Sequence, residues 1–390
     1  MNRNNFIINS FHQGLSYKEI LACLLKSLNL VLSLRQLKRI LRDNNLRRRG
    51  NNNQVAIVNA IQSELRGDGC NLGYRSMHQK LILRHRLNTS REQVRLLLLH
   101  LDPEGVESRK RRRLRRRTYH CRGPNDVWHI DGYDKLKPYG FAVHGCVDGY
   151  SRKVLWLTVG STNNDPEIIA KHYLDYVSEI KGTARRIRAD CGTENSNVAG
   201  VQRFFRLHAE DEDDNFSGLE SFLYGKSTSN QRIEAYWSRL RGAASQFWIN
   251  LFKDMRDAGE LDETDDIYRD CLRFSFMGLV QQSLDDARLL HNTHRIRPYP
   301  LQECPNGKPN IIYGIPEAYD TVDYKVEVEE DEIGIAREVT KEPLELGCSV
   351  EFLELANFIM EEEGLQAPEN VDEAKILYFT LTAVIRNGHI

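Results

Sequence analysis

The sequence lacks the patterns that mark membrane-spanning, secreted and small disulfide-stapled proteins. Its longest unbroken apolar run, Ile20–Leu25, has six residues, whereas a membrane-spanning helix needs about twenty, and residues 1–5 show no signal-peptide pattern. The eight cysteines include no C-x-x-C pair, so neither a disulfide framework nor a zinc knuckle is indicated. His291 and His294, with Cys304 nearby, form a weak metal motif, and the interpretation we favour is the end of a helix near Arg295 and Arg297. We therefore expect a soluble, intracellular protein with reduced thiols and no membrane partner.

The near-zero net charge of the 390 residues conceals a strong segregation of charge along the chain. Residues 1–125 carry 26 Lys and Arg against 8 Asp and Glu, whereas residues 317–390 carry 19 acidic and 5 basic residues. The length suggests two to three domains. The charge distribution indicates a basic arm for a polyanion, a nearly neutral body and an acidic tail. The alternative for the arm is a basic surface that is merely solvated.

Two helices are predicted within residues 16–41. Ser16 with Glu19, and Ser33 with Gln36, match the capping-box pattern that opens a helix. The second helix has an apolar stripe on one face and four cations on the other. These cations are Arg35, Lys38, Arg39 and Arg42. The pattern predicts either a helix-turn-helix module, whose second helix enters the DNA major groove, or an ordinary helical hairpin with a solvated basic face.

A second helical module and a block of cations follow. Residues 73–81 can open one helix, and Thr89 with Glu92 is the predicted cap of another. Eight of the nine residues from 109 to 117 are cations: Arg109, Lys110, Arg111, Arg112, Arg113, Arg115, Arg116 and Arg117. Such a block stays extended until phosphates neutralise it. It also matches a nuclear localisation signal, so we expect the nucleus in a eukaryote and the cytoplasm otherwise.

From residue 126 the hydrophobic pattern changes from helical spacing to short apolar runs, which predict strands. The predicted order is strands at 127–131, 141–148 and 154–159, a helix from 165 to 180, a strand at 185–190, and a later helix. If the fourth strand lies parallel to and beside the first, Asp131 and Asp190 sit on neighbouring strands roughly 4.8 Å apart. Such carboxylates stay ionised together only around a cation, and their oxygens suit Mg²⁺ or Mn²⁺. Glu234, on the later helix, is the third acid that a second ion needs.

Three segments together resemble the integrase core domain of retroviral integrases and of DDE transposases of bacterial insertion sequences. They are Trp128-His129-Ile130-Asp131, Asp190-Cys191-Gly192-Thr193-Glu194-Asn195 and Asn230-Gln231-Arg232-Ile233-Glu234. The resemblance covers roughly residues 123–300 and implies a ribonuclease H-like fold. It also implies that Asp131, Asp190 and Glu234 are catalytic and hold two Mg²⁺ or Mn²⁺ ions. The chain departs from retroviral members in three ways: it has no His-His-Cys-Cys zinc module, a polar loop at 210–214 lengthens the interval before Glu234, and its C-terminal region is acidic instead of basic.

We therefore predict an α/β protein with a ribonuclease H-like mixed five-stranded sheet and flanking helices. Helix-turn-helix modules precede this core, and a small acidic helical tail follows it. The predicted domains are a helix-turn-helix module at 1–50, a second helical DNA-binding module at 51–105, a basic linker at 106–122, the catalytic core at 123–300 and an acidic region at 301–390.

The predicted function is a metal-dependent polynucleotidyl transferase that cleaves and joins DNA, in a mobile element or retained by a host. The alternative is a catalytically silent DNA-binding scaffold or regulator derived from a transposable element. Arg239 and Arg241 are further candidates for contact with DNA. A homo-oligomer is expected, because joining two DNA ends takes two active sites in this family. The acidic tail is expected to bind a protein partner, to compete for the basic arm or to be a solvated appendage.

Overall fold

The computed structural model describes six stretches of the chain, which form two compact units. The described stretches are residues 2–47, 54–109, 119–207, 216–226, 229–298 and 304–387. Unit 1 comprises residues 1–124, 150–153 and 289–323, and unit 2 comprises residues 125–149, 154–288 and 324–390. Each unit therefore joins segments that lie far apart in the sequence. Among the helices of these stretches, each is too short or too polar to cross a lipid bilayer.

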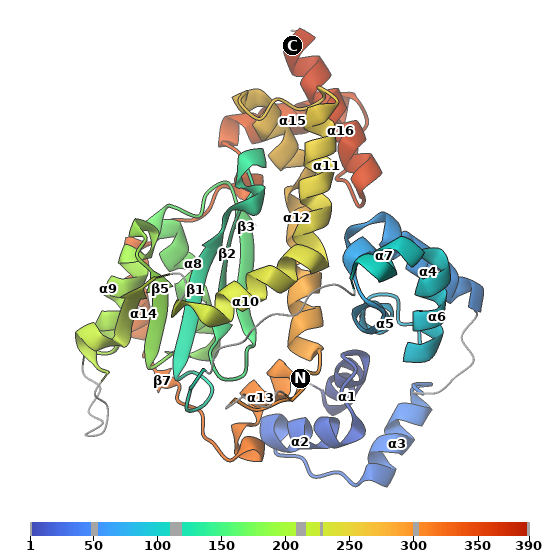
Figure 1. The fold of residues 1–390 in the computed structure, drawn as a ribbon. Coiled ribbons are helices and arrows are strands. Elements are labelled where there is room, and N and C mark those ends of the chain that lie inside the picture. Colours follow the sequence, from blue (N-terminus) through green and yellow to red (C-terminus); the bar gives the residue numbers. More distant parts are fainter. Residues whose placement is uncertain are drawn as a thin grey trace. The chain divides into compact units, whose positions relative to one another are not determined.

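Unit 1 is helical, and its local signals are largely those predicted. Its helices are α1 (Arg3–His12), α2 (Tyr17–Leu28), α3 (Leu34–Asp43), α4 (Gln54–Arg66), α5 (Tyr74–Leu83), α6 (Arg91–Leu101), α7 (Pro103–Ser108) and α13 (Pro309–Gly314), coloured blue, cyan and orange in Figure 1. Both predicted capping boxes, at Ser16 and Ser33, are formed. The predicted cap of α6 is wrong by one residue: Ser90, not Thr89, accepts the hydrogen bond from Gln93 N at 3.1 Å. The Thr89 hydroxyl instead donates to the Gln93 side chain at 2.9 Å.

A buried ion cluster ties α4 to α5. The Lys80 side chain is almost fully buried, and its Nζ lies 3.0 Å from Glu64 Oε2 and 2.6 Å from Asp68 Oδ1. His85 Nε2 lies 2.6 Å from the other Glu64 oxygen. Burial by itself would raise the pKa of Glu64, but the His85 hydrogen bond and the Lys80 charge outweigh it and lower that pKa to about 2. The cluster therefore holds Glu64 ionised inside the protein.

Unit 2 contains the predicted mixed five-stranded sheet, which is confirmed. Its strands are β1 (Val127–Tyr133), β2 (Ala142–Asp148), β3 (Val154–Gly160), β5 (Arg186–Asp190) and β6 (Phe222–Gly225), in the order β3-β2-β1-β5-β6. Strands β1, β2 and β3 are antiparallel neighbours, whereas β5 is parallel to β1 and β6 is parallel to β5. The sequence pattern locates all of these except β6, which has only four residues. A separate pair, β4 (Gly182–Thr183) and β7 (Val326–Glu327), is antiparallel.

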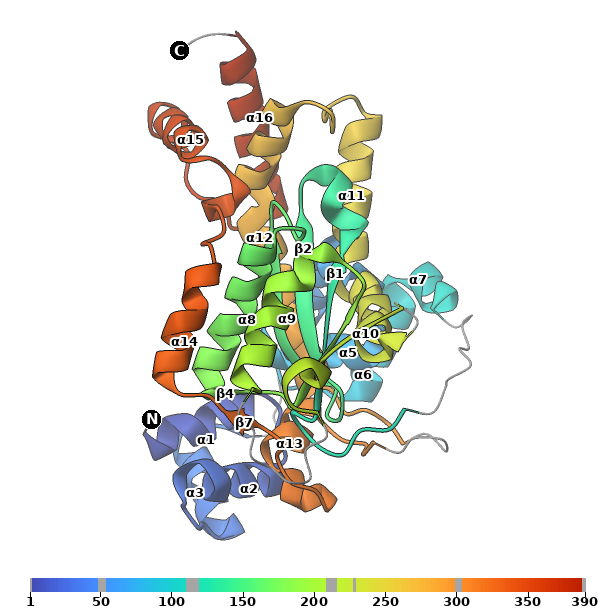
Figure 2. The same cartoon turned by 90° about the vertical axis from the view of Figure 1, so that its left-hand side faces the viewer.

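Helices cover both faces of the sheet (Figures 1 and 2). Helices α8 (Pro166–Ile180) and α9 (Ser196–Phe205) lie on one face, and α10 (Gln231–Leu240) lies on the other. Successive β1 side chains alternate between these faces. Trp128 packs against Tyr176 of α8 with ring centroids 5.5 Å apart, whereas Tyr133 packs against Trp237 of α10 at 5.2 Å. Asp131 has the same parity as Tyr133 and therefore faces α10.

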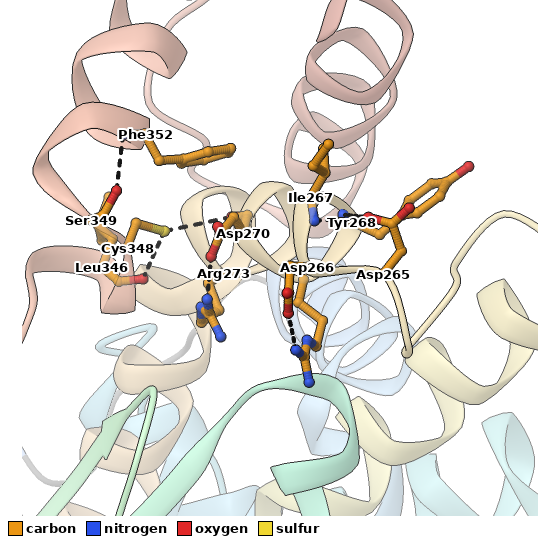
Figure 3. A network of polar contacts seen from close by, with 11 residues as sticks. Asp265, Asp266, Ile267, Tyr268, Asp270, Arg273, Leu346, Cys348, Ser349 and Phe352 are labelled. Carbon is orange, nitrogen blue, oxygen red and sulfur yellow. Dashed lines mark hydrogen bonds and ion pairs between the residues drawn. The ribbon is translucent and has the colours of Figure 1, made fainter. Parts of the chain in front are cut away.

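The acidic tail is part of the core of unit 2, so the expectation of a solvated appendage is wrong. Helix α10 continues through a π-helical turn (Arg241–Ser245) into α11 (Gln246–Asp257), and the long α12 spans Asp266–Thr293. Helices α14 (Glu330–Ala336), α15 (Val350–Glu362) and α16 (Val371–Asn387) follow, and α15 and α16 pack with α11 and α12 in one hydrophobic cluster. Near the start of α12, Cys348 Sγ donates to the Asp270 carbonyl at 3.5 Å, and Ser349 caps α15 at Phe352 N (Figure 3). The buried faces of α15 and α16 are apolar, and their acids point to solvent.

The interpretation of His291 and His294 as a helix end is confirmed. Helix α12 ends at Thr293, within unit 1. His291 Nε2 lies 2.8 Å from the Arg152 carbonyl oxygen. Because a carbonyl oxygen only accepts, this ring nitrogen carries the hydrogen, so it is not available to bind a metal.

Candidate active site

The pairing of β1 with β5 brings two of the three predicted acids to one edge of the sheet. Val127 pairs with Arg186, and His129 pairs with Arg188, in a parallel ladder. The same offset along the two strands relates Asp131 to Asp190. The predicted juxtaposition of the two strands is therefore confirmed, and it follows from the α8 crossover between them.

The third acid, Glu234, lies in the first turn of α10, whose start is fastened to β1 by Asn230. The Asn230 side chain is buried; its Nδ2 donates to the Ile130 carbonyl at 2.9 Å, and its Oδ1 lies 2.6 Å from His129 Nδ1. Burial lowers the pKa of His129 to about 3 despite the opposing Asn230 contact, so the ring is neutral and donates from Nδ1. These two hydrogen bonds hold the N-terminal end of α10 beside the strand that carries Asp131.

Trp237 links the acid of β1 directly to the helix that carries Glu234. The indole Nε1 of Trp237 donates to Asp131 Oδ2 at 2.8 Å. Gly145, which pairs with Asp131 across β1 and β2, leaves room for this ring, because a Cβ at that position would lie 2.9 Å from Trp237 Cη2. The glycine is therefore required by the close approach of the indole.

The three carboxylates share one electrostatic environment. Burial raises the pKa of Asp131 to about 7, the Trp237 hydrogen bond opposes this shift, and the charges of Asp190 and Glu234 add to it. Burial and the Asp190 charge also raise the pKa of Glu234. Asp190 Oδ1 is buried and accepts no hydrogen bond from any described residue. Each acid is therefore close enough to at least one other for their charges to interact.

The donor chemistry suits a hard divalent cation. Carboxylate oxygens are the ligands that Mg²⁺ and Mn²⁺ prefer, and Asp190 offers a buried oxygen with no competing donor. In the described stretches, no three Asp, Glu, His or Cys side chains are close enough to form a complete metal-ligand set. Ionised carboxylates repel one another, so a cation is what would draw the three together.

Trp237 and Glu194 are site residues that the sequence interpretation did not include. Trp237 lies on the apolar face of α10, and its spacing of three from Glu234 and the need of a buried indole N–H for an acceptor are signals of its role. Glu194 lies near Asp190: burial raises its pKa, and the charges of Asp190 and Asp134 raise it further. Its Oε1 accepts from the Asn195 side chain at 2.8 Å.

The predicted DNA-contacting cations fall into three groups. Arg35, Lys38, Arg39 and Arg42 are exposed along α3 in unit 1, and Arg239 and Arg241 are exposed near the end of α10 in unit 2. Arg109 is held by Asp102 at 3.0 Å and by the Cys70 carbonyl at 3.3 Å, so it is engaged within unit 1. Outside the described residues lie Lys110, Arg111, Arg112, Arg113, Arg115, Arg116 and Arg117, and also the polar loop at 210–214.

Comparison with known proteins agrees with this geometry. Residues 118–306 match the family model described as the integrase core domain. A search of curated proteins gives no match to the chain. The matched segment includes β1, β5 and α10, which carry Asp131, Asp190 and Glu234. Residues 118–306 are therefore similar to the integrase core domain, and their mixed sheet with flanking helices is consistent with a ribonuclease H-like fold.

Proposed function

We propose that the protein is a metal-dependent polynucleotidyl transferase that cleaves DNA and joins DNA strands. The single observation that carries the proposal is the electrostatic coupling of Asp131, Asp190 and Glu234 within an integrase core domain. The charge of Asp190 raises the pKa of both Asp131 and Glu234, and the charge of Glu234 also raises that of Asp131. Clustered carboxylates with perturbed pKa values are a common sign of a functional site. Structural ion clusters also perturb pKa values, but no cationic side chain is among the causes of the shifts of Asp131 and Glu234.

The proposed roles follow from the contacts of each residue. Asp131, Asp190 and Glu234 would hold two Mg²⁺ or Mn²⁺ ions, and bound ions would supply the positive charge that lowers the pKa of an attacking hydroxyl and stabilises the leaving oxygen. Because the pKa of Asp131 is about 7, this carboxyl gives up a proton when it becomes a ligand near neutral pH. Trp237 orients Asp131 through Oδ2. Asn230 keeps the start of α10, and with it Glu234, at the strand.

DNA is the proposed partner. The exposed cations of α3 form the recognition face of a helix-turn-helix module, and Arg239 and Arg241 contact the DNA backbone beside the core. A homo-oligomeric state, a protein partner for the acidic surface of 301–390 and domain boundaries near residues 50, 105 and 122 belong to the same proposal. So does a nuclear location in a eukaryotic host. The predicted boundary near residue 300 does not hold, because residues 289–323 belong to unit 1 and residues 324–390 to unit 2.

A nicking and strand-transfer assay on supercoiled plasmid with Mn²⁺ tests the proposal without knowledge of a target sequence. Asp131→Asn and Glu234→Gln should each reduce product to background, because each removes one ligand oxygen and one charge. Glu179→Gln is the matched control, since Glu179 is an exposed helical acid on α8, on the other face of the sheet. Undiminished product from a folded Asp131→Asn or Glu234→Gln variant would refute the catalytic roles.

A catalytically silent DNA-binding scaffold is the second candidate. The observation that favours it is that the described acids do not form a complete ligand set. The two candidates differ in the heat of Mg²⁺ binding, which calorimetry on the full chain measures. Heat that disappears in Glu234→Gln supports the transferase, whereas DNA binding with no Mg²⁺ heat in the wild-type protein supports the scaffold.

A further inference from the structure

A cavity of about 570 Å³ lies within unit 1, and none of the residues that line it is acidic. Four segments form its walls: the end of α1, the loop after α3, the stretch from α5 to the start of α6, and residues 293–297 at the end of α12 together with Lys308. The last of these follows most of unit 2 in the sequence, whereas the other three belong to the basic arm. A volume of this size is in the range of ligand-binding cavities.

The cavity is lined by six guanidinium groups that lack an acidic partner. They are Arg47, Arg75, Arg86, Arg91, Arg295 and Arg297. None of the six forms an ion pair of 4 Å or less with another residue in the described part of the chain. Lys308 also lines the cavity, but Glu19 neutralises it at 2.9 Å. The concentration of like charge is unfavourable for folding by itself and is relieved when an anion binds.

The histidines of the cavity respond to this positive field. Burial lowers the pKa of His12, and the charge of Arg86 lowers it further. Burial also lowers the pKa of His78, with Arg91 adding to the effect and the contact to the Thr89 carbonyl opposing it. His78 Nε2 lies 2.9 Å from that carbonyl oxygen and therefore donates to it. These two of the three histidines that line the cavity are neutral at pH 7, so they add no positive charge to that of the arginines.

We propose that this cavity binds the phosphodiester backbone of DNA. The guanidinium group pairs bidentately with phosphate oxygens, and six such charges exceed what one phosphate neutralises, whereas a nucleic acid chain supplies one charge per nucleotide. The cavity shares no residue with the exposed basic face of α3, so it is a second DNA contact of unit 1. The inference rests on DNA as the partner named in the proposed function.

The test measures DNA binding by fluorescence anisotropy with full-length protein in EDTA, so that catalysis does not contribute. Labelled duplex and labelled single strand are titrated over a range of salt concentrations against a triple variant, Arg86→Gln, Arg295→Gln and Arg297→Gln. Three lost phosphate contacts should reduce the slope of log affinity against log salt by roughly 2 to 3. At low salt, affinity should fall by at least about tenfold.

Two matched variants separate the cavity from net charge and from folding. Arg256→Gln, Arg269→Gln and Arg337→Gln remove the same charge from ion-paired arginines of unit 2 and should leave the slope unchanged. Replacement of Arg86, Arg295 and Arg297 by lysine keeps the positive charge and should leave the slope of log affinity against log salt unchanged.

The outcomes are distinct. A reduced slope with single strand alone, or with duplex as well, supports the cavity and identifies the form of DNA that enters it. An unchanged slope overturns the inference. The inference is also overturned if the cavity variant loses affinity for inorganic tripolyphosphate, titrated in the same way, but keeps its affinity for DNA. Plasmid nicking by the wild-type protein tests the proposed function separately. If the plasmid is nicked and the slope of the cavity variant is unchanged, only DNA binding at the cavity is refuted. If the slope is reduced and the plasmid is not nicked, only the catalytic function is refuted.

Discussion

Replacement of Trp237 by phenylalanine should raise the pKa of Asp131. The Trp237 indole N–H donates to Asp131 Oδ2 at 2.8 Å and stabilises the ionised carboxylate. Phenylalanine keeps an aromatic ring beside Tyr133 but removes the donor. Because the hydrogen bond favours the charged form, its loss favours the protonated form. The pKa of Asp131, about 7 in the wild-type protein, should therefore move upward.

The size of the shift follows from the energy of the lost hydrogen bond. A hydrogen bond to a charged group contributes roughly 1.5 to 3 kcal/mol, and one pKa unit corresponds to about 1.36 kcal/mol. The expected shift is therefore about one to two units, with the lower value expected if water reaches Oδ2. Asp131 would then be mostly protonated at pH 7, and metal binding, which needs the carboxylate, should require a correspondingly higher pH.

The assay is a pH titration of the metal-free protein labelled with ¹³C at aspartate carboxyls, followed by Mn²⁺ binding over the same pH range. Trp248→Phe is the matched control: Trp248 is a buried tryptophan of α11 whose Nε1 has no hydrogen-bond partner among the described residues. The Trp248→Phe variant loses the same side-chain volume as Trp237→Phe but leaves the hydrogen bond to Asp131 intact. An unchanged or lowered pKa in Trp237→Phe, or the same rise in both variants, would refute the reasoning.

Two further predictions concern stability. The pKa of Asp131 is higher in the folded protein, about 7, than in an unfolded chain, about 3.9, so the stability that this proton confers is full below pH 4 and is lost as pH rises to 7. Asp131→Asn should therefore raise the free energy of unfolding at pH 8 by at most about 4 kcal/mol and change it little at pH 4, as measured by urea denaturation with wild type as reference. Lys80→Met leaves Glu64 and Asp68 buried without their cation, and should cost about 3 to 5 kcal/mol at pH 7 in the same assay. Since the pKa of Glu64 is lowered to about 2, the wild-type protein should lose stability as pH falls from about 4.5 to 2, and a Lys80→Met variant that is as stable as wild type at pH 7 would contradict the role of the cluster.

The sequence predicted those features that depend on neighbouring residues. The capping boxes at Ser16 and Ser33 and the first-turn proline of α8 are local signals, and all three are formed. The position of Thr89 was misjudged by one residue, because Ser90 offers the same hydroxyl at the next position. The placement of Asp131 beside Asp190 came from a topological rule, since a right-handed crossover leaves few alternatives for a parallel strand.

Contacts between distant segments could not be predicted in this way. No local sequence pattern predicts that Gly145 makes room for the Trp237 ring, or that the Trp237 indole then donates a hydrogen bond to Asp131. The packing of α15 and α16 with α11 and α12 was also missed, because apolar residues at helical spacing predict a helix but not the segment against which it packs.

Sequence by itself determined the element types, the segregation of charge and the identity of three acids in an integrase-like order. Only the tertiary structure decided which polar groups meet: the indole that holds Asp131, the lysine buried between Glu64 and Asp68, and the arginines from three segments that line one cavity. The physical reason is the sequence separation between the residues that interact. Helix caps and strand alternation are set by residues a few positions apart, whereas burial and electrostatic coupling depend on which remote segments exclude water from the same place.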